Sequence, residues 1–192
     1  MSQETFNWIW LILLFCIIVM RKIHERKSGR QIRLKAPIIE AGLMILWGIA
    51  AGILPFFYLF GNLLDFANIE MHPVFGFVGT AIFLLAIWLL HRSHTDLGKL
   101  WKTTVEPEPG QRLITDGIYK RIRHPMYTAH VLWGVAQALL LPNLIAGPLA
   151  LLLILAIISI RVPREERAML EEFGGEYQRY MDKTGGILPK IK

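Results

Sequence analysis

Apolar residues occur along this chain in five long stretches separated by shorter polar connections. A helix needs about 20 largely apolar residues to cross a membrane, and somewhat shorter stretches are tolerated. The five stretches are Phe6–Met20, Pro37–Phe60, Pro73–Leu90, Met126–Leu141 and Leu144–Ile160. The pattern therefore predicts an all-α, polytopic integral membrane protein with five transmembrane helices.

Prolines divide or distort this pattern at two places. The last two stretches are separated only by Pro142-Asn143, which is a turn signal, and we expect them to form a tight helical hairpin. Pro55 lies inside the second stretch and is expected to bend or locally open that helix.

The basic residues are concentrated in the polar connections. Of the 192 residues 54% are hydrophobic, and the 21 Lys and Arg fall in three blocks, Arg21–Lys35, Arg92–Arg123 and Arg161–Lys192. A soluble domain needs charge around its whole surface, so this segregation favours membrane insertion. The net charge of +6 then has a topological explanation, and we expect no nucleic-acid partner.

The same blocks predict the orientation of the chain. Cytoplasmic loops carry the excess of Lys and Arg, so all three blocks should face the cytoplasm. The connection Gly61–His72 contains Asp65 and Glu70 but no Lys or Arg, and should face outward. Five spans then place the N-terminus outside and the C-terminus in the cytoplasm. Trp8, Trp10 and Trp88, near the ends of spans, are expected to be interfacial anchors.

A short polar motif, Arg123-His124-Pro125-Met126-Tyr127, stands where the fourth apolar stretch begins. Proline favours an extended residue before it and suits the first turn of a helix. His124 should therefore lie at the mouth of the fourth span, next to backbone N–H groups without intrahelical acceptors. Such a helix start is suited to a carboxylate or phosphate. The alternative is that His124 only caps the helix or sits at the interface.

A second polar cluster follows the fifth stretch. Arg161 and Glu165 are four residues apart and share one helix face if the helix continues through Pro163. The alternative is a solvated ion pair of little consequence. Because Glu165 and Glu166 are adjacent and point in different directions, we expect only one of them to face the start of the fourth span. Leu170, Phe173, Tyr177 and Tyr180 form an amphipathic face that Gly174-Gly175 interrupts.

The connection before the motif contains a turn signal, Asp116-Gly117. The apolar pair Leu113-Ile114 before it either lines a pocket or dips into the membrane interface. His91 and His94 have a helical metal-ligand spacing, but no further ligand completes a site, and we expect no metal. The sequence contains neither a GxGxxG motif nor a P-loop, which excludes the soluble types of nucleotide-binding module.

Three strings carry a resemblance to a known family: Leu113-Ile-Thr-Asp-Gly117-Ile-Tyr119, Arg123-His-Pro-Met-Tyr127, and Glu165-Glu166-x3-Leu170-x2-Phe173-Gly174-x2-Tyr177-x2-Tyr180. In this order around a helical hairpin they resemble the C-terminal half of isoprenylcysteine carboxyl methyltransferases, whose relatives include small membrane phospholipid methyltransferases. The resemblance extends from about Leu113 to Pro189, and the first three spans contribute no motif to it.

The resemblance implies use of S-adenosylmethionine (SAM), with S-adenosylhomocysteine as product, and it implies a role for named residues. Arg161 would face the substrate carboxylate. The residues that would surround the cofactor are Gln111, Arg112, Leu113, Ile114, Tyr119, His124, Pro125, Met126, Tyr127, Glu165 and Glu166. The whole chain, 1–192, would form one integral membrane methyltransferase domain, with its cofactor-binding polar region in 91–127 and 161–192.

The implied reaction is transfer of a methyl group to the C-terminal carboxylate of an isoprenylated cysteine at the cytoplasmic membrane face, with the prenyl chain arriving from the bilayer. The alternatives are N-methylation of a phosphatidylethanolamine-type lipid and, in a different class, a non-enzymatic membrane scaffold. The expected location is the plasma membrane in a prokaryote or the endoplasmic reticulum in a eukaryote.

Overall fold

The computed structural model describes residues 2–28, 37–98 and 112–190, and these form helices joined by short connections. The described residues contain no strand, and two isolated β-bridges, Asn68 with Asn143 and Ile122 with Gly185, are their only sheet-like pairings. The longer helices are α1 (Gln3–Ser28), α2 (Ile38–Gly48), α3 (Leu54–Phe60), α4 (Pro73–Leu97), α5 (Pro125–Leu140), α6 (Leu149–Phe173) and α7 (Gly175–Lys183). The predicted all-α class is confirmed.

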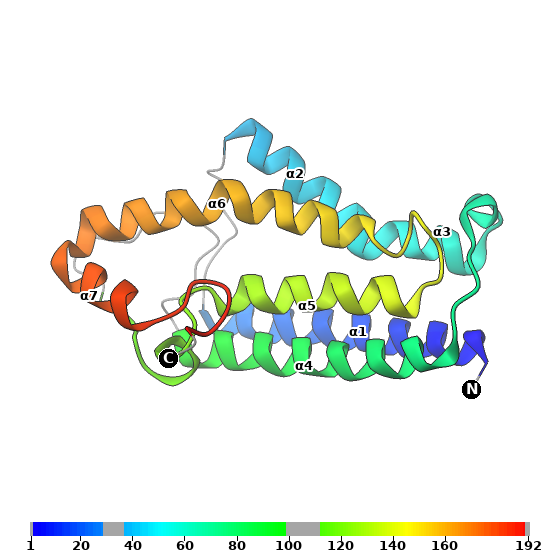
Figure 1. The fold of residues 1–192 in the computed structure, drawn as a ribbon, viewed down its shortest axis with the longest axis horizontal. Coiled ribbons are helices and arrows are strands. Elements are labelled where there is room, and N and C mark those ends of the chain that lie inside the picture. Colours follow the sequence, from blue (N-terminus) through cyan, green and yellow to red (C-terminus); the bar gives the residue numbers. More distant parts are fainter. Residues whose placement is uncertain (1, 29–36, 99–111, 191–192) are drawn as a thin grey trace.

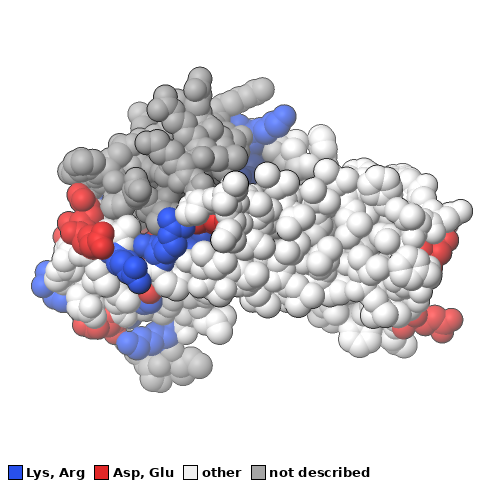
Figure 2. Space-filling model, turned by 90° about the horizontal axis from the view of Figure 1, so that it is seen from above, with Lys and Arg blue, Asp and Glu red and all other residues white. Residues whose placement is uncertain are grey.

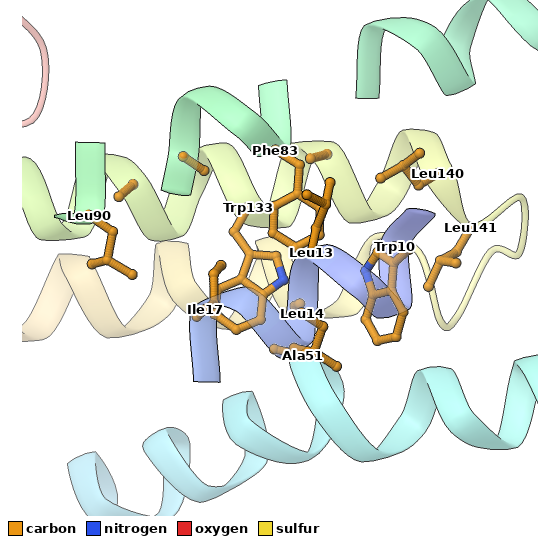
Figure 3. Packing of buried hydrophobic residues seen from close by; sticks show 14 of the residues in the cluster. Trp10, Leu13, Leu14, Ile17, Ala51, Phe83, Leu90, Trp133, Leu140 and Leu141 are labelled. Atoms are coloured by element: carbon orange, nitrogen blue, oxygen red, sulfur yellow. The ribbon is translucent and has the colours of Figure 1, made fainter. Parts of the chain in front are cut away.

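The helices lie roughly along one long axis. In Figure 1, α1, α4 and α5 run side by side in one layer, and α6 crosses above α5 with α2 on its other side. The buried core fills the space between α1, α4 and α5 and includes Trp10, Phe83 and Trp133 (Figure 3). Trp10 is completely buried, so its predicted interfacial role is wrong, whereas Trp8 and Trp88 remain exposed.

Three segments are long and apolar enough to cross a membrane by length and composition. They are Gln3–His24, Ile38–Phe60 and Pro73–Leu97. Large apolar side chains face outward along them, as Phe15, Ile53 and Phe77 do. Exposed apolar surface of this extent is typical of helices that contact lipid. The molecule is therefore a helical membrane protein.

The second of these segments is opened before Pro55, as predicted. Residues Ile49–Ile53 form a π-helical turn, η1, between α2 and α3. In a π turn the Ala50 carbonyl would accept from residue 55, but proline has no N–H. The Gln137 side-chain amide of α5 donates to the Ala50 oxygen instead, at 2.9 Å. A buried hydrogen bond between helices thus replaces the backbone hydrogen bond that Pro55 cannot donate.

The α5–α6 hairpin forms as predicted, but α6 begins later than expected. Asn143 Oδ1 accepts from the backbone N–H groups of Ile145 and Ala146, and its Nδ2 donates to the Leu64 carbonyl. These bonds hold residues 143–148 in turns, so the helix starts at Leu149 and not at Leu144. It then continues through Pro163 to Phe173, well beyond the predicted end at Ile160.

Charge is distributed unequally between the two ends of the molecule. Figure 2 shows basic side chains in the half that holds α7 and the second part of α6, a long uncharged body, and only acidic side chains at the opposite end. The hairpin places the start of α5 and the second half of α6 at the charged end (Figure 1). Both motifs recognised in the sequence therefore lie at one end of the bundle.

Candidate active site

The first turn of α5 is held in place by a return segment from the C-terminal region. The N–H groups of Arg123 and His124 donate to the carbonyls of Gly185 and Gly186, at 2.8 and 3.1 Å. Thr128, one turn into α5, donates its hydroxyl to the Ile187 carbonyl. Residues 184–187, which we call the C-terminal strap, thus fix the backbone where the motif enters the helix, and sequence reasoning missed this contact.

His124 precedes the helix with φ −120° and ψ 56°, which is outside the extended region, and Pro125 occupies the first helical position. The next two residues, Met126 and Tyr127, belong to the first turn, where N–H groups have no acceptor within the helix. The His124 side chain makes no capping bond, which excludes the capping alternative. The predicted helix start at Pro125 is confirmed, whereas the extended backbone predicted for His124 is not found.

His124 lies between the two adjacent glutamates of α6. Its Nε2 atom is 3.1 Å from Glu166 Oε1, and its Nδ1 atom is 3.6 Å from Glu165 Oε2. The prediction that only one glutamate faces α5 is therefore wrong. The two side chains do leave the helix in different directions, but the imidazole stands between them and meets one with each nitrogen.

The charges around His124 control its protonation. Burial lowers the pKa of this histidine, but hydrogen bonds to Glu165 and Glu166 and the charges of both carboxylates outweigh that effect, so the pKa is raised above its ordinary value. The hydrogen bond from His124, opposed by burial and reinforced by Arg123, lowers the pKa of Glu166 to about 2. The raised pKa of His124 and the lowered pKa of Glu166 both favour the charged forms of this pair.

Arg123 closes the far side of Glu166. Its Nε and Nη2 atoms donate to Glu166 Oε1 at 3.0 and 2.8 Å, and its Nη1 atom donates to the carbonyls of Met181 and Thr184. Arg123, His124 and Glu166, which we call the Glu166 cluster, thus connect α5, α6 and the C-terminal strap. The donors to Glu166 Oε1 are thus side chains of this chain, Arg123 and His124.

Glu165 belongs to a second cluster on the neighbouring face of α6. Its Oε1 atom accepts a hydrogen bond from the Tyr127 hydroxyl and lies 3.3 Å from Arg161 Nη2. The i, i+4 pairing of Arg161 with Glu165 predicted from the sequence is confirmed. Arg161 is only 7% exposed, which rules out the alternative of a solvated surface pair.

Glu40 of α2 completes this second cluster and was not recognised as a site residue in the sequence. Its Oε1 atom lies 3.2 Å from Arg161 Nη1, and its Oε2 atom pairs with Arg164. A lone carboxylate at the start of an apolar stretch was the available signal, but its partner is remote in sequence. We call Glu40, Tyr127, Arg161 and Glu165 the Glu165 cluster; Arg164 pairs with Glu40 from outside this cluster.

The connection before the motif forms a wall beside these clusters. Gly117 has a φ of +61° and takes the predicted turn, and an added Cβ would collide with the Asp96 carboxylate of α4. The Asp96 carboxylate also accepts from the Ile118 N–H at 2.8 Å. Tyr119 is buried, donates its hydroxyl to the Ser93 carbonyl, and accepts at its own carbonyl from Tyr180.

The remaining predicted site residues, Gln111 to Ile114, either make no direct contact with the two clusters or lie outside the described residues. Leu113 is buried and Ile114 is half-buried, while Arg112 is exposed. Gln111 lies outside the described residues. Direct contacts thus join His124, Tyr127, Arg161, Glu165 and Glu166 into one group, whereas no such contact joins Arg112, Leu113 or Ile114 to it in the described residues. The part of the chain that the structure describes holds no group of residues able to bind a metal.

Comparisons with known proteins point to one family. Residues 78–171 match the family model "Isoprenylcysteine carboxyl methyltransferase (ICMT) family". A probable protein-S-isoprenylcysteine O-methyltransferase of Oryza sativa subsp. indica is 31% identical over 115 residues, which are 60% of this chain and 58% of the relative. A protein-S-isoprenylcysteine O-methyltransferase of Schizosaccharomyces pombe is 34% identical over 79 residues, 41% of this chain and 34% of the relative.

A solved structure shows the same fold. It is that of the eukaryotic intramembrane Ras methyltransferase ICMT, without a monobody; it aligns with a TM-score of 0.54 and 22% identity, over 80% of this chain and 52% of the other. The chain thus spans a little over half the length of its first curated relatives. The comparisons thus find the family that the three strings of the sequence resemble.

Proposed function

We propose that this chain, whose residues 78–171 match the isoprenylcysteine carboxyl methyltransferase family, methylates the C-terminal carboxylate of an isoprenylated cysteine with SAM. The observation that carries the proposal is the meeting of Arg161, Glu165 and the first turn of α5 at one end of the bundle. A guanidinium, a carboxylate and helix-start N–H groups are together suited to a substrate carboxylate and to the cofactor.

The residues present fit the polar groups of SAM. Glu165 is suited to the ammonium of the methionine moiety or to the ribose hydroxyls, and the N–H groups of Met126 and Tyr127 are suited to its carboxylate. Tyr119, Leu113 and Ile114 would contribute the less polar wall. Tyr119 remains a neutral phenol, because burial, followed by the charges of Tyr180, Asp96 and Glu165, raises its pKa.

When bound, SAM supplies a methyl group from its sulfonium and leaves as S-adenosylhomocysteine. A C-terminal carboxyl group has a pKa of about 3.5, so it is already ionised at neutral pH and needs no base. The task of the protein is then to align the carboxylate and exclude water, which in favourable cases lowers a barrier by roughly 7–11 kcal/mol. Arg161 would hold the carboxylate through the planar fork of its guanidinium.

The surroundings of His124 favour a carboxylate acceptor over an amine. An amine must lose a proton before it attacks, and a nearby base would have to take it. His124 faces a carboxylate with each ring nitrogen, and its raised pKa disfavours the neutral imidazole that a base would need.

We further propose that all five apolar stretches cross the membrane, with the N-terminus outside and residues 1–192 forming one domain. Supporting this are the three helices long enough to span, the hairpin of α5 and α6, and the gathering of basic side chains, beside acidic ones, in one half of the molecule in Figure 2. The clusters would then face the cytoplasm, of either the plasma membrane or the endoplasmic reticulum, and the prenyl chain would approach from the bilayer.

Methyl transfer to two different acceptors tests the function. The purified full chain, in lipid nanodiscs, is incubated with methyl-labelled SAM and either an S-farnesylcysteine analogue or phosphatidylethanolamine. We expect label on the first acceptor, released as methanol by alkali as for a carboxyl ester. Alkali-stable label on the amine lipid would instead establish N-methylation. Absence of transfer to both, together with absence of SAM binding, would favour a non-enzymatic membrane protein.

A further inference from the structure

Glu40 is unusual in its position and its burial. It lies in the first turn of α2, where its neighbours Ile38 and Ile39 are 88% and 71% exposed, yet only 2% of Glu40 is exposed. Burying a carboxylate is strongly unfavourable unless basic groups compensate for the lost water. The Glu40 carboxylate therefore points toward Arg161 and Arg164 of α6, and away from the exterior that Ile38 and Ile39 face.

The contacts of Glu40 converge on the arginine that we assign to the substrate. Glu40 Oε1 is 3.2 Å from Arg161 Nη1, and Met44 Sδ, one turn further along α2, is 3.1 Å from the same nitrogen. Glu165 Oε1 contacts the other terminal nitrogen, Nη2, at 3.3 Å. The two terminal nitrogens of Arg161 thus contact different helices: Nη1 contacts α2, and Nη2 contacts α6.

We propose that Glu40 is a positioning residue that sets the orientation of the Arg161 guanidinium for the substrate carboxylate; this inference rests on the proposed function. A carboxylate is recognised best when both prongs of the guanidinium point at it in one plane. Because Arg161 has a flexible side chain, orienting it before the substrate arrives reduces the entropy lost on binding. Glu40 provides that orientation without touching substrate or cofactor.

A purely structural role must be separated from this one. Glu40 also pairs with Arg164, whose side chain is 41% exposed, and that pair alone would hold α2 against α6. A structural anchor would affect SAM binding and substrate binding alike. A positioning residue for Arg161 affects the substrate and leaves the cofactor largely unaffected, and its effect disappears when Arg161 is removed.

Kinetics of the full chain in nanodiscs test this separation. We expect Glu40→Gln to raise KM for the S-farnesylcysteine analogue about tenfold, with the Kd for SAM unchanged within about twofold. The matched control Arg164→Gln removes the other partner of Glu40 and should leave KM within about twofold of wild type. In an Arg161→Gln background, adding Glu40→Gln should change KM no further.

Several results would overturn the inference. An active Glu40→Gln protein with wild-type KM, a parallel loss of SAM affinity, or additive effects in the double variant would each do so. A wild type that transfers no methyl to the carboxyl acceptor would instead overturn the proposed function and the inference together. If Glu40→Gln does not fold, Met44→Ala removes the other α2 contact of Arg161 Nη1, and an unchanged KM would then count against the inference.

Discussion

Glu165 and Glu166 are neighbours in the chain, but their surroundings differ in kind. Glu166 Oε1 receives Nε and Nη2 of Arg123 at 3.0 and 2.8 Å and Nε2 of His124 at 3.1 Å. Glu165 has longer contacts with charged groups, 3.3 Å to Arg161 and 3.6 Å to His124. Three charged donors thus converge on Glu166 Oε1, whereas Glu165 combines a short hydrogen bond from the Tyr127 hydroxyl with longer contacts to its charged neighbours.

This difference separates a structural cluster from a binding cluster. The Glu166 cluster connects α5, α6 and the C-terminal strap, and a ligand that takes Glu166 Oε1 would have to break short charged hydrogen bonds. The Glu165 cluster exchanges partners at lower cost, because its charged contacts are longer. We therefore assign SAM and the substrate to the Glu165 cluster and the positioning of the α5 first turn to the Glu166 cluster.

The largest effect is expected from Arg161→Ala. Removing the guanidinium removes the proposed partner of the substrate carboxylate, and we expect kcat/KM for the S-farnesylcysteine analogue to fall about a hundredfold or more. SAM affinity should be largely kept, because Glu165 and the start of α5 remain. Steady-state kinetics and a calorimetric SAM titration measure the two effects. Lost SAM binding with an unchanged substrate KM would place Arg161 at the cofactor instead.

The next effect concerns the Glu166 cluster. Arg123→Gln removes the two hydrogen bonds to Glu166 Oε1 and those to the carbonyls of Met181 and Thr184, so we expect a loss of about 2–3 kcal/mol in the free energy of unfolding. Thermal denaturation in detergent, compared with the exposed control Arg92→Gln, measures this loss. Equal midpoints for the two variants would show that the cluster contributes little to stability.

The sequence predicted that the two clusters lie at one end of the bundle, but it did not predict which residues contact Glu165 and which contact Glu166. The short Pro142-Asn143 turn returns α6 toward the start of α5, so residues near 124 and 161 had to lie at one end. Angular separation along a helix predicted that one glutamate would face α5. The outcome differs because His124 stands between the two side chains, which depends on the strap and Pro125 placing the imidazole there.

Other features depended on contacts between segments remote in sequence. The partner of Arg161 on α2 could not be inferred, since Glu40 precedes an apolar stretch that contains no matching charge. The start of α6 was misplaced because the turn signal Gly147-Pro148 was overlooked within an apolar run. The Asn143 side chain, fixed by the remote Leu64 carbonyl, holds residues 144–148 in turns through local hydrogen bonds.

Stability should depend on pH through the Glu166 cluster. The pKa of Glu166 is lowered to about 2, so its contribution is present above its ordinary value of 4.5 and is lost as pH falls toward 2. The pKa of His124 is raised, so its contribution is complete below 6.5 and is lost as pH rises through the folded value.

Melting midpoints measured from pH 6 upward test this dependence. Wild type should lose stability as His124 deprotonates, and Glu166→Gln should show a smaller loss, because one of the two carboxylates that hold the histidine cation is gone. Parallel profiles for the two proteins would mean that His124 and Glu166 do not interact in solution.

The smallest effect is expected at the wall beside the clusters. Tyr180→Phe removes only the hydroxyl that donates to the Tyr119 carbonyl at 2.6 Å, and should cost about 1 kcal/mol of stability. SAM affinity should stay within about twofold of wild type. Thermal denaturation and titration measure both quantities, and a large loss of SAM affinity would show that the position of Tyr119 is more critical than its contacts indicate.

The division between the two clusters is tested most directly by SAM titration of a matched pair of variants. Glu165→Gln and Glu166→Gln make the same change at adjacent positions, and isothermal calorimetry of each folded protein in nanodiscs gives its Kd. We predict that Glu165→Gln weakens SAM binding about tenfold or more, whereas Glu166→Gln lowers stability and leaves the Kd within about threefold. Equal losses, or a larger loss at Glu166, would contradict the assignment of the cofactor to the Glu165 cluster.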